Sequence, residues 1–404
     1  MTAPGLRLEH LRQRLHALGA KPCHERLVLR AWMQARPLDS GPRAAEDFLP
    51  GRLREALPAM AAQWGALARL RSSHPGQDGS ERLLVELPDG QSVECVLLPR
   101  DGLCVSTQVG CAVGCAFCMT GRQGLARHLG SAEIVAQVAL ARSRRFVKKV
   151  VFMGMGEPSH NLDEVLDAID LLGTEGGIAH KNLVFSTVGD RRVFERLPRG
   201  RVKPALALSL HSTFAGQRER LMRHAPRIDP AELVALGEAY ARTTHYPIQY
   251  QWTLLAGVND TDEEVDGIVR LLAGKYAVMN LIAYNAVEGL PFERPPAGRT
   301  TAIAQRLNER GVLTKLRNSA GQDVEGGCGQ LRARDPVAAG RAGIAAARAA
   351  RAPQAVFRRR STISACSTSS PHATTAPPCC ASPPSHAVMR PPAPSTMGIS
   401  ACTS

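Results

Sequence analysis

The sequence has no uninterrupted apolar stretch of about 18 residues, the length that a membrane-spanning helix needs. Charged side chains already occur between Met1 and Arg14, so we expect no secretory signal peptide. These two absences predict a cytoplasmic protein that has no membrane association. Thiols stay reduced in that compartment and structural disulfides are rare there, which matters for a chain with 11 cysteines.

Acidic residues are also in the minority. The 404 residues include 36 Asp and Glu against 50 Lys and Arg, which gives a formal net charge of +14. A basic chain favours a polyanionic partner, and nucleic acid is the usual one. Because part of the excess lies near the C-terminus, charge alone supports RNA or DNA only weakly.

The cysteines lack the second, separated pair that a structural zinc site usually has. Instead, Cys111, Cys115 and Cys118 form a C-x3-C-x2-C run in one short segment. Cysteine thiolates are the ligands of iron–sulfur clusters, and a [4Fe–4S] cluster has four irons to be held. Three ligands from one loop leave one iron open to a small molecule. This arrangement resembles that of radical S-adenosylmethionine (SAM) enzymes.

Two segments are expected to precede the core domain. Residues 1–75 are predicted to form a helical accessory domain, because leucines recur near helical spacing. These are Leu6, Leu8, Leu11, Leu15 and Leu18. Residues 76–100 are predicted to form a β-hairpin, since two alternating runs, 82–87 and 92–98, flank Asp89-Gly90.

From Leu103 onward, strand-like and helix-like segments alternate. The expected strands are 103–108, 148–153, 182–187, 205–210, 248–254 and 278–282, and the expected helices are 131–145, 162–172, 231–242 and 261–272, with Ser131 and Thr261 as helix starts. Six βα repeats predict a parallel sheet covered by helices and closed wholly or partly into a barrel. This core is expected over residues 101–335. Residues 336–404 have too little apolar periodicity to build a core, and we expect them to be disordered.

Polar and glycine residues stand where several of these strands end, and active sites of such folds gather at the carboxyl ends of strands. They are the glycine-rich run 154–158, Ser186, the run 209–211, and Asn285. Each taken singly is consistent with a helix cap or a satisfied core group. Their shared location favours a ligand pocket.

Two further cysteines are candidates for chemistry. Cys104 lies at the start of the first expected core strand, and Cys328 follows the last one, framed by glycines. An isolated cysteine is usually an inert small hydrophobe. In a cluster enzyme, a thiol on a glycine-rich loop is a candidate nucleophile.

Taken in order along residues 80–331, these motifs resemble the RlmN/Cfr family of radical-SAM RNA methyltransferases. They are the cluster loop followed by Thr120-Gly121-Arg122-Gln123-Gly124, then Gly-Met-Gly-Glu-Pro, Ser-Leu-His, Gly257-Val258-Asn259-Asp260 and Cys328-Gly329-Gln330-Leu331. Gly326-Gly327 stand where the family usually has two alanines, so we interpret the chain as a divergent member.

The resemblance implies an α/β fold, a radical-SAM partial (βα)6 barrel with an N-terminal helical accessory domain and a β-hairpin. It implies two cofactors, SAM and a [4Fe–4S] cluster that Cys111, Cys115 and Cys118 ligate. The positions that match the family's SAM-binding residues are Gly156, Glu157, Ser186, Ser209, Leu210, His211 and Asn285. The implied partners are RNA, either rRNA or tRNA or both, and a reductant such as flavodoxin or ferredoxin.

The resemblance also implies three catalytic residues. Cys328 matches the cysteine that is itself methylated, Cys104 the second reactive cysteine, and Glu94 the proton acceptor. From its place in a hairpin strand alone, Glu94 would be read as a solvent-facing residue.

The reaction implied for the family explains why these residues are needed. An aromatic C–H carbon of adenine is not a nucleophile, so polar transfer from SAM fails and radical chemistry is one solution. One SAM methylates Cys328, and a second SAM, cleaved by an electron from the cluster, activates that methyl group for addition to the adenine ring. Glu94 is expected to remove the ring proton, a duty that Cys104 could share. Cys104 then attacks the sulfur of Cys328, which forms a transient disulfide.

Three alternatives stay open from the sequence. Methylation at adenine C2 is favoured, but methylation at C8 would use the same two cysteines. A radical-SAM enzyme that acts on a protein or a small molecule would not need Cys104 and Cys328. A non-catalytic iron–sulfur or zinc protein that binds RNA would hold a metal without turnover.

Overall fold

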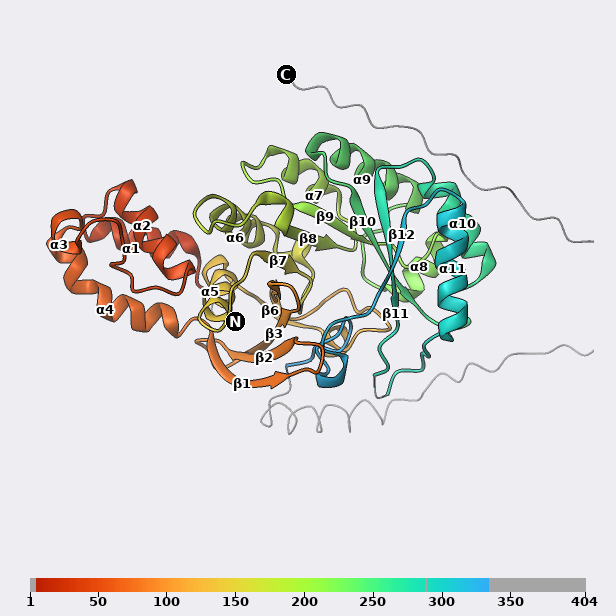
Figure 1. Cartoon of the computed structure of the whole chain (residues 1–404), viewed down its shortest axis with the longest axis horizontal. Helices are drawn as coiled ribbons and strands as arrows, with labels where there is room; N and C mark the ends of the chain where they lie inside the picture. The colour runs from red at the N-terminus through yellow and green to blue at the C-terminus, as the bar shows by residue number, and fades with distance from the viewer. Residues whose placement is uncertain (1–4, 288, 334–404) are drawn as a thin grey trace, which may run out of the picture. The chain divides into compact units, whose positions relative to one another are not determined.

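The computed structural model describes residues 5–287 and 289–333 (Figure 1). The expectation of disorder for residues 336–404 therefore lies outside the described residues.

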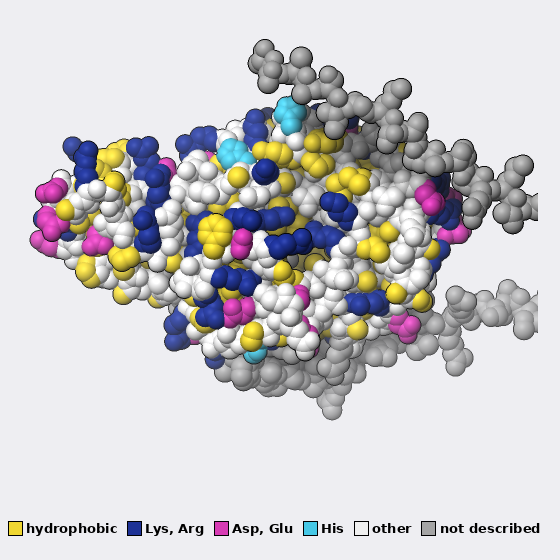
Figure 2. Space-filling model, in the orientation of Figure 1, with side chains coloured by type: hydrophobic (Ala, Val, Ile, Leu, Met, Phe, Trp, Pro, Cys, Tyr) yellow, Lys and Arg dark blue, Asp and Glu magenta, His cyan; other side chains and the backbone are white. Residues whose placement is uncertain are grey.

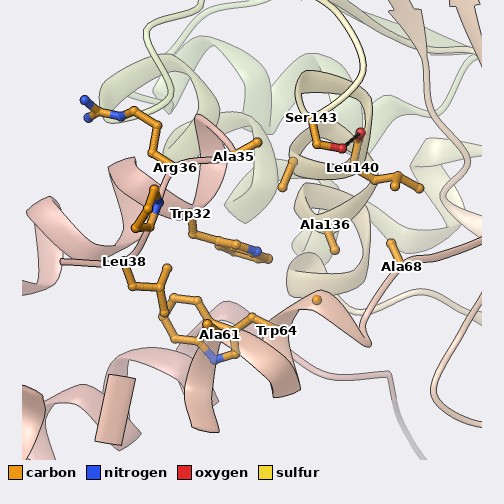
Figure 3. Close-up of a pocket in the computed structure, with 13 residues that line it drawn as sticks. Trp32, Ala35, Arg36, Leu38, Ala61, Trp64, Ala68, Ala136, Leu140 and Ser143 are labelled. Carbon is orange, nitrogen blue, oxygen red and sulfur yellow. Dashed lines mark hydrogen bonds between the residues drawn. The ribbon is translucent and has the colours of Figure 1, made fainter. Parts of the chain in front are cut away.

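The N-terminal part is helical, as the leucine spacing predicts. Its helices are α1 (Leu8–Ala17), α2 (Pro22–Met33), α3 (Ala45–Phe48) and α4 (Gly51–Gly65). The apolar face of α1 is buried, and the rings of Trp32 and Trp64 pack with their centroids 5.2 Å apart. Helices α1, α2 and α4 contact α5 (Ser131–Arg142) of the core, and a cavity of about 250 Å³ lies between the two tryptophans and Ala136 and Leu140 of α5 (Figure 3).

The expected hairpin is present, with β2 (Glu81–Glu86) antiparallel to β3 (Ser92–Leu98). Gly90 has a φ of +79° in its turn, a value that glycine adopts without strain. An additional strand, β1 (Arg69–Pro75), pairs with β2. The sequence did not predict β1, because its alternation of Arg, Ser and His side chains carries no apolar face.

The hairpin continues into one ten-stranded sheet with the order β1-β2-β3-β4-β7-β8-β9-β10-β11-β12. From β4 onward all neighbours are parallel. The parallel strands are β4 (Gly102–Cys104), β7 (Lys149–Phe152), β8 (Leu183–Thr187), β9 (Ala205–Ser209), β10 (Ile248–Leu254), β11 (Ala277–Ala283) and β12 (Thr314–Arg317). Since β4 pairs with β3 and not with β12, the barrel is open, and the α/β partial barrel expected from the βα repeats is confirmed.

Helices connect the successive parallel strands and cover the sheet (Figure 1). They are α5, α6 (Leu162–Thr174), α7 (Arg191–Arg196), α8 (Ala215–Leu221), α9 (Pro230–Thr244), α10 (Asp262–Leu272) and α11 (Ala297–Glu309). Short 3₁₀ helices are η1 (Thr120–Gln123), η2 (Pro158–Asn161), η3 (His180–Asn182), η4 (Leu197–Arg199) and η5 (Gln322–Val324). A small second sheet pairs β5 (Gln108–Gly110) with β6 (Leu125–His128).

Three local expectations were wrong or incomplete. The first core strand is much shorter than 103–108, and Cys104 ends it instead of beginning it. Ser131 is not the N-cap of α5: Gly130 is, and the Ser131 hydroxyl accepts a hydrogen bond from the Leu8 N–H at 2.9 Å. Helix α11 and strand β12 were not predicted, whereas Thr261 caps α10 as expected.

One large apolar core runs through the N-terminal helices, the hairpin and the barrel. A second, smaller apolar cluster surrounds the segment with the three closely spaced cysteines. Among the helices that the structure describes, none is long and apolar enough to cross a membrane.

Candidate functional site

The three cysteines of the C-x3-C-x2-C run lie on the loop that leaves β5. The Cys111 N–H donates to the Gly124 carbonyl at 2.9 Å, which closes the loop where it begins. Cys115 forms an isolated antiparallel bridge with Met222, and the Ala116 N–H donates to the Leu221 carbonyl at 2.8 Å. The chain at the end of α8 therefore pairs with the middle of this cluster loop through backbone contacts, as two short antiparallel strands would.

The surroundings of these thiols are apolar. They are half-buried and pack against Val113, Phe117, Val188, Leu221, Met222, Leu255 and Tyr284. Burial raises the pKa of Cys111 to about 12 and also raises the pKa of Cys115 and of Cys118. The free thiols are therefore protonated at neutral pH, and metal binding must release their protons.

The donor set fits an iron–sulfur cluster. In the ranges 5–287 and 289–333, no group of three or more His, Cys, Asp and Glu side chains is arranged to hold a single metal ion. A four-iron cluster takes its thiolates at separate irons, so its protein ligands stand apart. The chemistry of three thiols on one partly buried loop matches that requirement.

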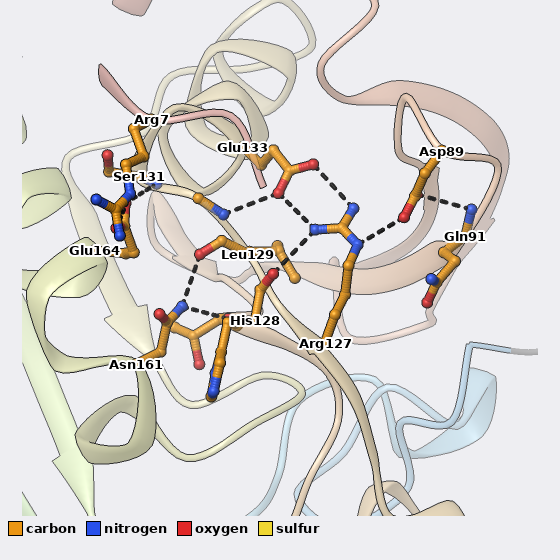
Figure 4. A network of polar contacts seen from close by, with 12 residues as sticks. Arg7, Asp89, Gln91, Arg127, His128, Leu129, Ser131, Glu133, Asn161 and Glu164 are labelled. Carbon is orange, nitrogen blue, oxygen red and sulfur yellow. Dashed lines mark hydrogen bonds and ion pairs between the residues drawn. The ribbon is translucent and has the colours of Figure 1, made fainter. Parts of the chain in front are cut away.

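A polar network holds β6, the strand that follows the cluster loop (Figure 4). Both terminal nitrogens of Arg127 donate to Glu133, at 2.8 and 2.9 Å, and its Nε donates to Asp89 in the hairpin turn at 2.7 Å. The Asn161 side chain donates to the Thr107 and Leu129 carbonyls at 2.9 and 2.7 Å. These bonds tie both strands that flank the cluster loop to the rest of the barrel.

Gly156 lies in the turn that follows β7. Its φ is +104°, and an added Cβ would lie 2.7 Å from the Gln108 Cβ and 2.8 Å from the Thr107 hydroxyl. Only glycine fits without displacing these neighbours. The backbone of this turn is thereby pressed against the residues that lead into the cluster loop.

Glu157 is buried and holds two loops together. Its carboxylate accepts hydrogen bonds from the Ser159 and Val188 N–H groups, both at 3.0 Å. Its own N–H donates to the Gln108 side chain at 2.7 Å. The Gly-Met-Gly-Glu-Pro turn therefore connects the cluster loop with the end of β8.

The next two strand ends carry Ser186 on β8 and Ser209 on β9. Both serines are half-buried, and within the described residues their hydroxyls form no hydrogen bond. Leu210 is fully buried, and its N–H donates to the Gln251 carbonyl at 3.0 Å. The two hydroxyls are consequently available to a ligand at the strand ends.

His211 is buried with a φ of +58°. Its Nδ1 accepts a hydrogen bond from the Thr253 N–H at 3.0 Å, so the neutral ring carries its proton on Nε2. Burial, and next the charge of Arg218, lowers the pKa of His211 to about 3. The Asn259 side chain donates to the His211 carbonyl at 2.8 Å and holds this conformation.

Asn285, the last of the expected SAM-binding residues, is hydrogen-bonded to the Cys328 loop. It is buried, and its amide donates to the Ser319 hydroxyl and to the Cys328 carbonyl, both at 3.0 Å. The Cys328 side chain itself is exposed. The Gly329 carbonyl accepts a hydrogen bond from the Met119 N–H at 2.8 Å, so the loop also rests on the end of the cluster loop.

Glu94 is buried, only 1 % exposed, so its reading as a solvent-facing hairpin residue was wrong. The chain after η5 covers this face of the hairpin: the Arg332 N–H donates to the Glu94 carboxylate at 2.7 Å. Arg82 forms a buried ion pair with Glu94, and its Nε donates to the Val324 carbonyl at 2.6 Å. The carboxylate therefore sits under the segment that carries Cys328.

Cys104 is the last residue of β4 and is buried. Burial, and next the proximity of Cys328, raises its pKa above the ordinary value of 9.0. Two residues further on, the Ser106 hydroxyl donates to the Glu94 carbonyl at 2.5 Å. The structure thus brings Cys104, Glu94 and the Cys328 loop to one end of the sheet, although more than two hundred residues separate the two cysteines in sequence.

Sequence reasoning missed three residues that shape this site: Arg82, Arg218 and Asn259. In the hairpin register Arg82 faces Val96 and therefore lies diagonal to Glu94, a cross-strand relation that the predicted hairpin already contained. Asn259 belongs to the Gly-Val-Asn-Asp motif, which carried no role. No pattern in the sequence singles out Arg218.

Comparisons with known proteins agree with this geometry. The model of the radical SAM superfamily matches residues 105–272. A probable RNA methyltransferase of Aromatoleum aromaticum is 74% identical over 81% of this chain and 93% of its own length, and one of Leptothrix cholodnii is 68% identical over 82% and 95%. The crystal structure of a radical SAM methyltransferase from Sphaerobacter thermophilus aligns with a TM-score of 0.70 and 33% identity, over 83% of this chain and all of that one. The chain therefore belongs to the radical SAM superfamily and, within it, to the family of SAM-dependent methyltransferases described as probable RNA methyltransferases.

Proposed function

We propose that this protein is an RNA methyltransferase of the RlmN/Cfr type, which transfers a methyl-derived carbon through Cys328 to C2 of an adenine in rRNA or tRNA. One observation carries the proposal. The loop of the exposed Cys328 is hydrogen-bonded to the cluster loop, to Asn285 and to Glu94, with Cys104 buried beside it.

The residues that would hold the cofactors line successive strand ends. Cys111, Cys115 and Cys118 would ligate a [4Fe–4S] cluster, and the SAM site would consist of Gly156, Glu157, Ser186, Ser209, Leu210, His211 and Asn285. When bound, the two groups supply the methyl group and the one-electron chemistry that a non-nucleophilic ring carbon requires. A protein reductant such as flavodoxin or ferredoxin would deliver the electrons.

Cys328 and its loop position the transferred carbon. The thiol accepts the methyl group and then carries it to the adenine, because it is the exposed thiol whose loop touches both the cluster loop and Asn285. Hydrogen bonds from Asn285 and Met119 hold the backbone of this loop at Cys328 and Gly329. Such fixed placement of reacting groups accounts for a large part of many enzymatic accelerations.

Glu94 and Cys104 release the product. The Glu94 carboxylate, which is paired with Arg82 and held by the Arg332 N–H, would accept the proton from the ring carbon. Cys104 then attacks the Cys328 sulfur: an S–S bond forms, the C–S bond breaks, and the carbon keeps the electron pair and takes up a proton. The resulting disulfide must be reduced before the next turnover.

An RNA substrate agrees with the charge of the chain. The formal net charge is +14, and Lys and Arg side chains form a band across the middle of the face shown in Figure 2. Such a surface attracts phosphates without regard to sequence. The residues that recognise the target nucleotide would lie at the strand ends near Cys328.

Nucleoside mass spectrometry of total rRNA and tRNA, from cells with and without this protein, tests the proposal. We expect 2-methyladenosine to disappear on deletion and to return with the wild-type protein and with Cys23→Ala, whose thiol lies on α2. Cys328→Ala and Cys104→Ala should not restore it. Loss of 8-methyladenosine instead would refute C2 chemistry, and an unchanged set of RNA nucleosides would refute the RNA substrate.

A further inference from the structure

Arg218 is a buried cation that forms no ion pair within the described part of the chain. Three arginines are buried in the described part of the chain. Arg82 is paired with Glu94, and Arg127 with Glu133. Arg218, only 4 % exposed, forms no ion pair with any described residue.

The fold places Arg218 against the cluster loop. It lies on α8, and its carbonyl accepts a hydrogen bond from the Met222 N–H at 2.9 Å. Met222 is the residue that bridges Cys115. Arg218 is therefore one helical turn from the backbone pairing that holds the middle of the cluster loop.

The guanidinium is only partly satisfied. One terminal N–H donates to the Val188 carbonyl, and the Val188 N–H donates to Glu157, so Arg218 also connects to the Gly-Met-Gly-Glu-Pro turn. Its Nε is buried and has no hydrogen-bond partner among residues 5–287 and 289–333. Burial lowers the pKa of Arg218; negative charge at Cys115, once that thiol is ionised, and at the buried Glu157 opposes the shift.

A buried charge and a buried donor without partners are both costly, and proteins retain them where a ligand supplies the partner. Three thiolates around an iron–sulfur cluster bring negative charge into this pocket, and reduction of the cluster adds one more. Nearby cations and hydrogen bonds to the sulfurs raise the reduction potential of such clusters.

We propose that Arg218 is the counter-ion of the cluster held by Cys111, Cys115 and Cys118, and that its charge and its Nε–H set the potential at which that cluster accepts an electron. The inference rests on the proposed function, because it requires the cluster. Arg218 acts through the cluster and has no direct role toward the RNA.

The test is a redox titration of anaerobically reconstituted full-length protein. Arg218→Met and Arg218→Gln should each shift the one-electron equilibrium about tenfold toward the oxidised cluster, which is about 59 mV to more negative potential. Arg218→Lys keeps the charge and should remain closer to the wild type. The matched control is Arg220→Met on the same helix, where an exposed guanidinium donates to the Gln217 side chain; this substitution should leave the potential unchanged.

The deciding result of a second measurement comes from the wild-type protein. In wild-type protein labelled with ¹⁵N-arginine, pulsed electron paramagnetic resonance of the reduced cluster should show a ¹⁵N hyperfine coupling, and Arg218→Lys should abolish it. Absence of the coupling in the wild type overturns the inference.

The outcomes separate this inference from the proposed function. If the wild-type protein binds no four-iron cluster, the proposed function itself fails. If it binds the cluster but Arg218→Met and Arg218→Gln leave the potential unchanged, only the counter-ion role is wrong. A weaker binding of SAM at an unchanged potential would likewise overturn it, because the guanidinium would then serve the SAM carboxylate.

Discussion

The pair formed by Arg82 and Glu94 has two consequences: it gives a buried carboxylate a buried counter-charge, and it anchors the segment that carries Cys328. Glu94→Gln would leave Arg82 buried without a counter-charge, so we expect about 3 kcal/mol of destabilisation in addition to lost turnover. Urea unfolding of the apo-protein measures the first effect and single-turnover methylation the second.

The neighbouring pair between Arg69 and Glu86 is the control, because its arginine is exposed. Glu86→Gln should cost less than about 1 kcal/mol and leave turnover intact. Equal effects of the two substitutions would show that Glu94 has no special role.

The raised pKa of Cys104 predicts a pH dependence. Only the thiolate attacks a sulfur, and burial keeps the pKa of Cys104 above 9.0, so its thiolate fraction is small at neutral pH. Release of methylated RNA from the covalent adduct should therefore accelerate, by about tenfold per pH unit, between about pH 7 and about pH 9. Rapid-quench measurement of adduct decay follows this step. Cys104→Ala should retain the adduct at every pH, and a pH-independent decay in the wild type would contradict the assignment.

The turn after β7 is a tight element, since Gly156 combines a positive φ with crowding by Gln108 and Thr107. We expect Gly156→Ala to lose about 2–3 kcal/mol of stability and to weaken SAM binding, because the turn must move. Gly177→Ala is the matched control: its φ is +68°, but nothing lies within 4 Å of an added Cβ. That substitution should cost only about 1 kcal/mol, the backbone strain alone. Urea unfolding and calorimetric SAM titration measure both variants, and equal losses would mean that crowding is unimportant.

The elements differ in how well their local pattern predicted them. Strand β10 and the hairpin agree closely with prediction, because their apolar residues and turn residues act over a few neighbours. Strand β12 was missed because its side chains are mostly exposed, so its sequence carries no apolar pattern, and its extended form is supported by its pairing with β11. The pleated run expected from residue 103 to residue 108 breaks after Cys104, since the chain turns there toward the cluster loop.

For the whole chain, the net charge of +14 predicts a strong salt dependence of RNA binding. Each phosphate contact releases counterions, so affinity should fall roughly a thousandfold between about 50 and about 200 mM salt if about six phosphates are contacted. Filter binding with tRNA or rRNA fragments measures this. SAM affinity over the same salt range is the control and should change little. An RNA affinity that ignores salt would argue against a charged interface.

The large apolar core is continuous from the N-terminal helices through the hairpin to the barrel. The expected boundaries of the accessory domain and of the hairpin stay predictions. Their immediate consequence is visible nevertheless: α1, α2 and α4 contact α5, whose first turn is linked through Glu133 and Arg127 to the strand that follows the cluster loop.

The sequence by itself determined the alternation of strands and helices, the three cysteines of one loop and the polar groups at successive strand ends, because short-range spacing encodes each of them. Only the tertiary structure decided that Glu94 is buried against Arg82, that Cys104 lies beside a loop more than two hundred residues away, and that Arg218 forms no ion pair with the described residues. Those three facts depend on how segments distant in sequence pack against one another. Burial of a charged group results from that packing, and the spacing of neighbouring residues does not encode it.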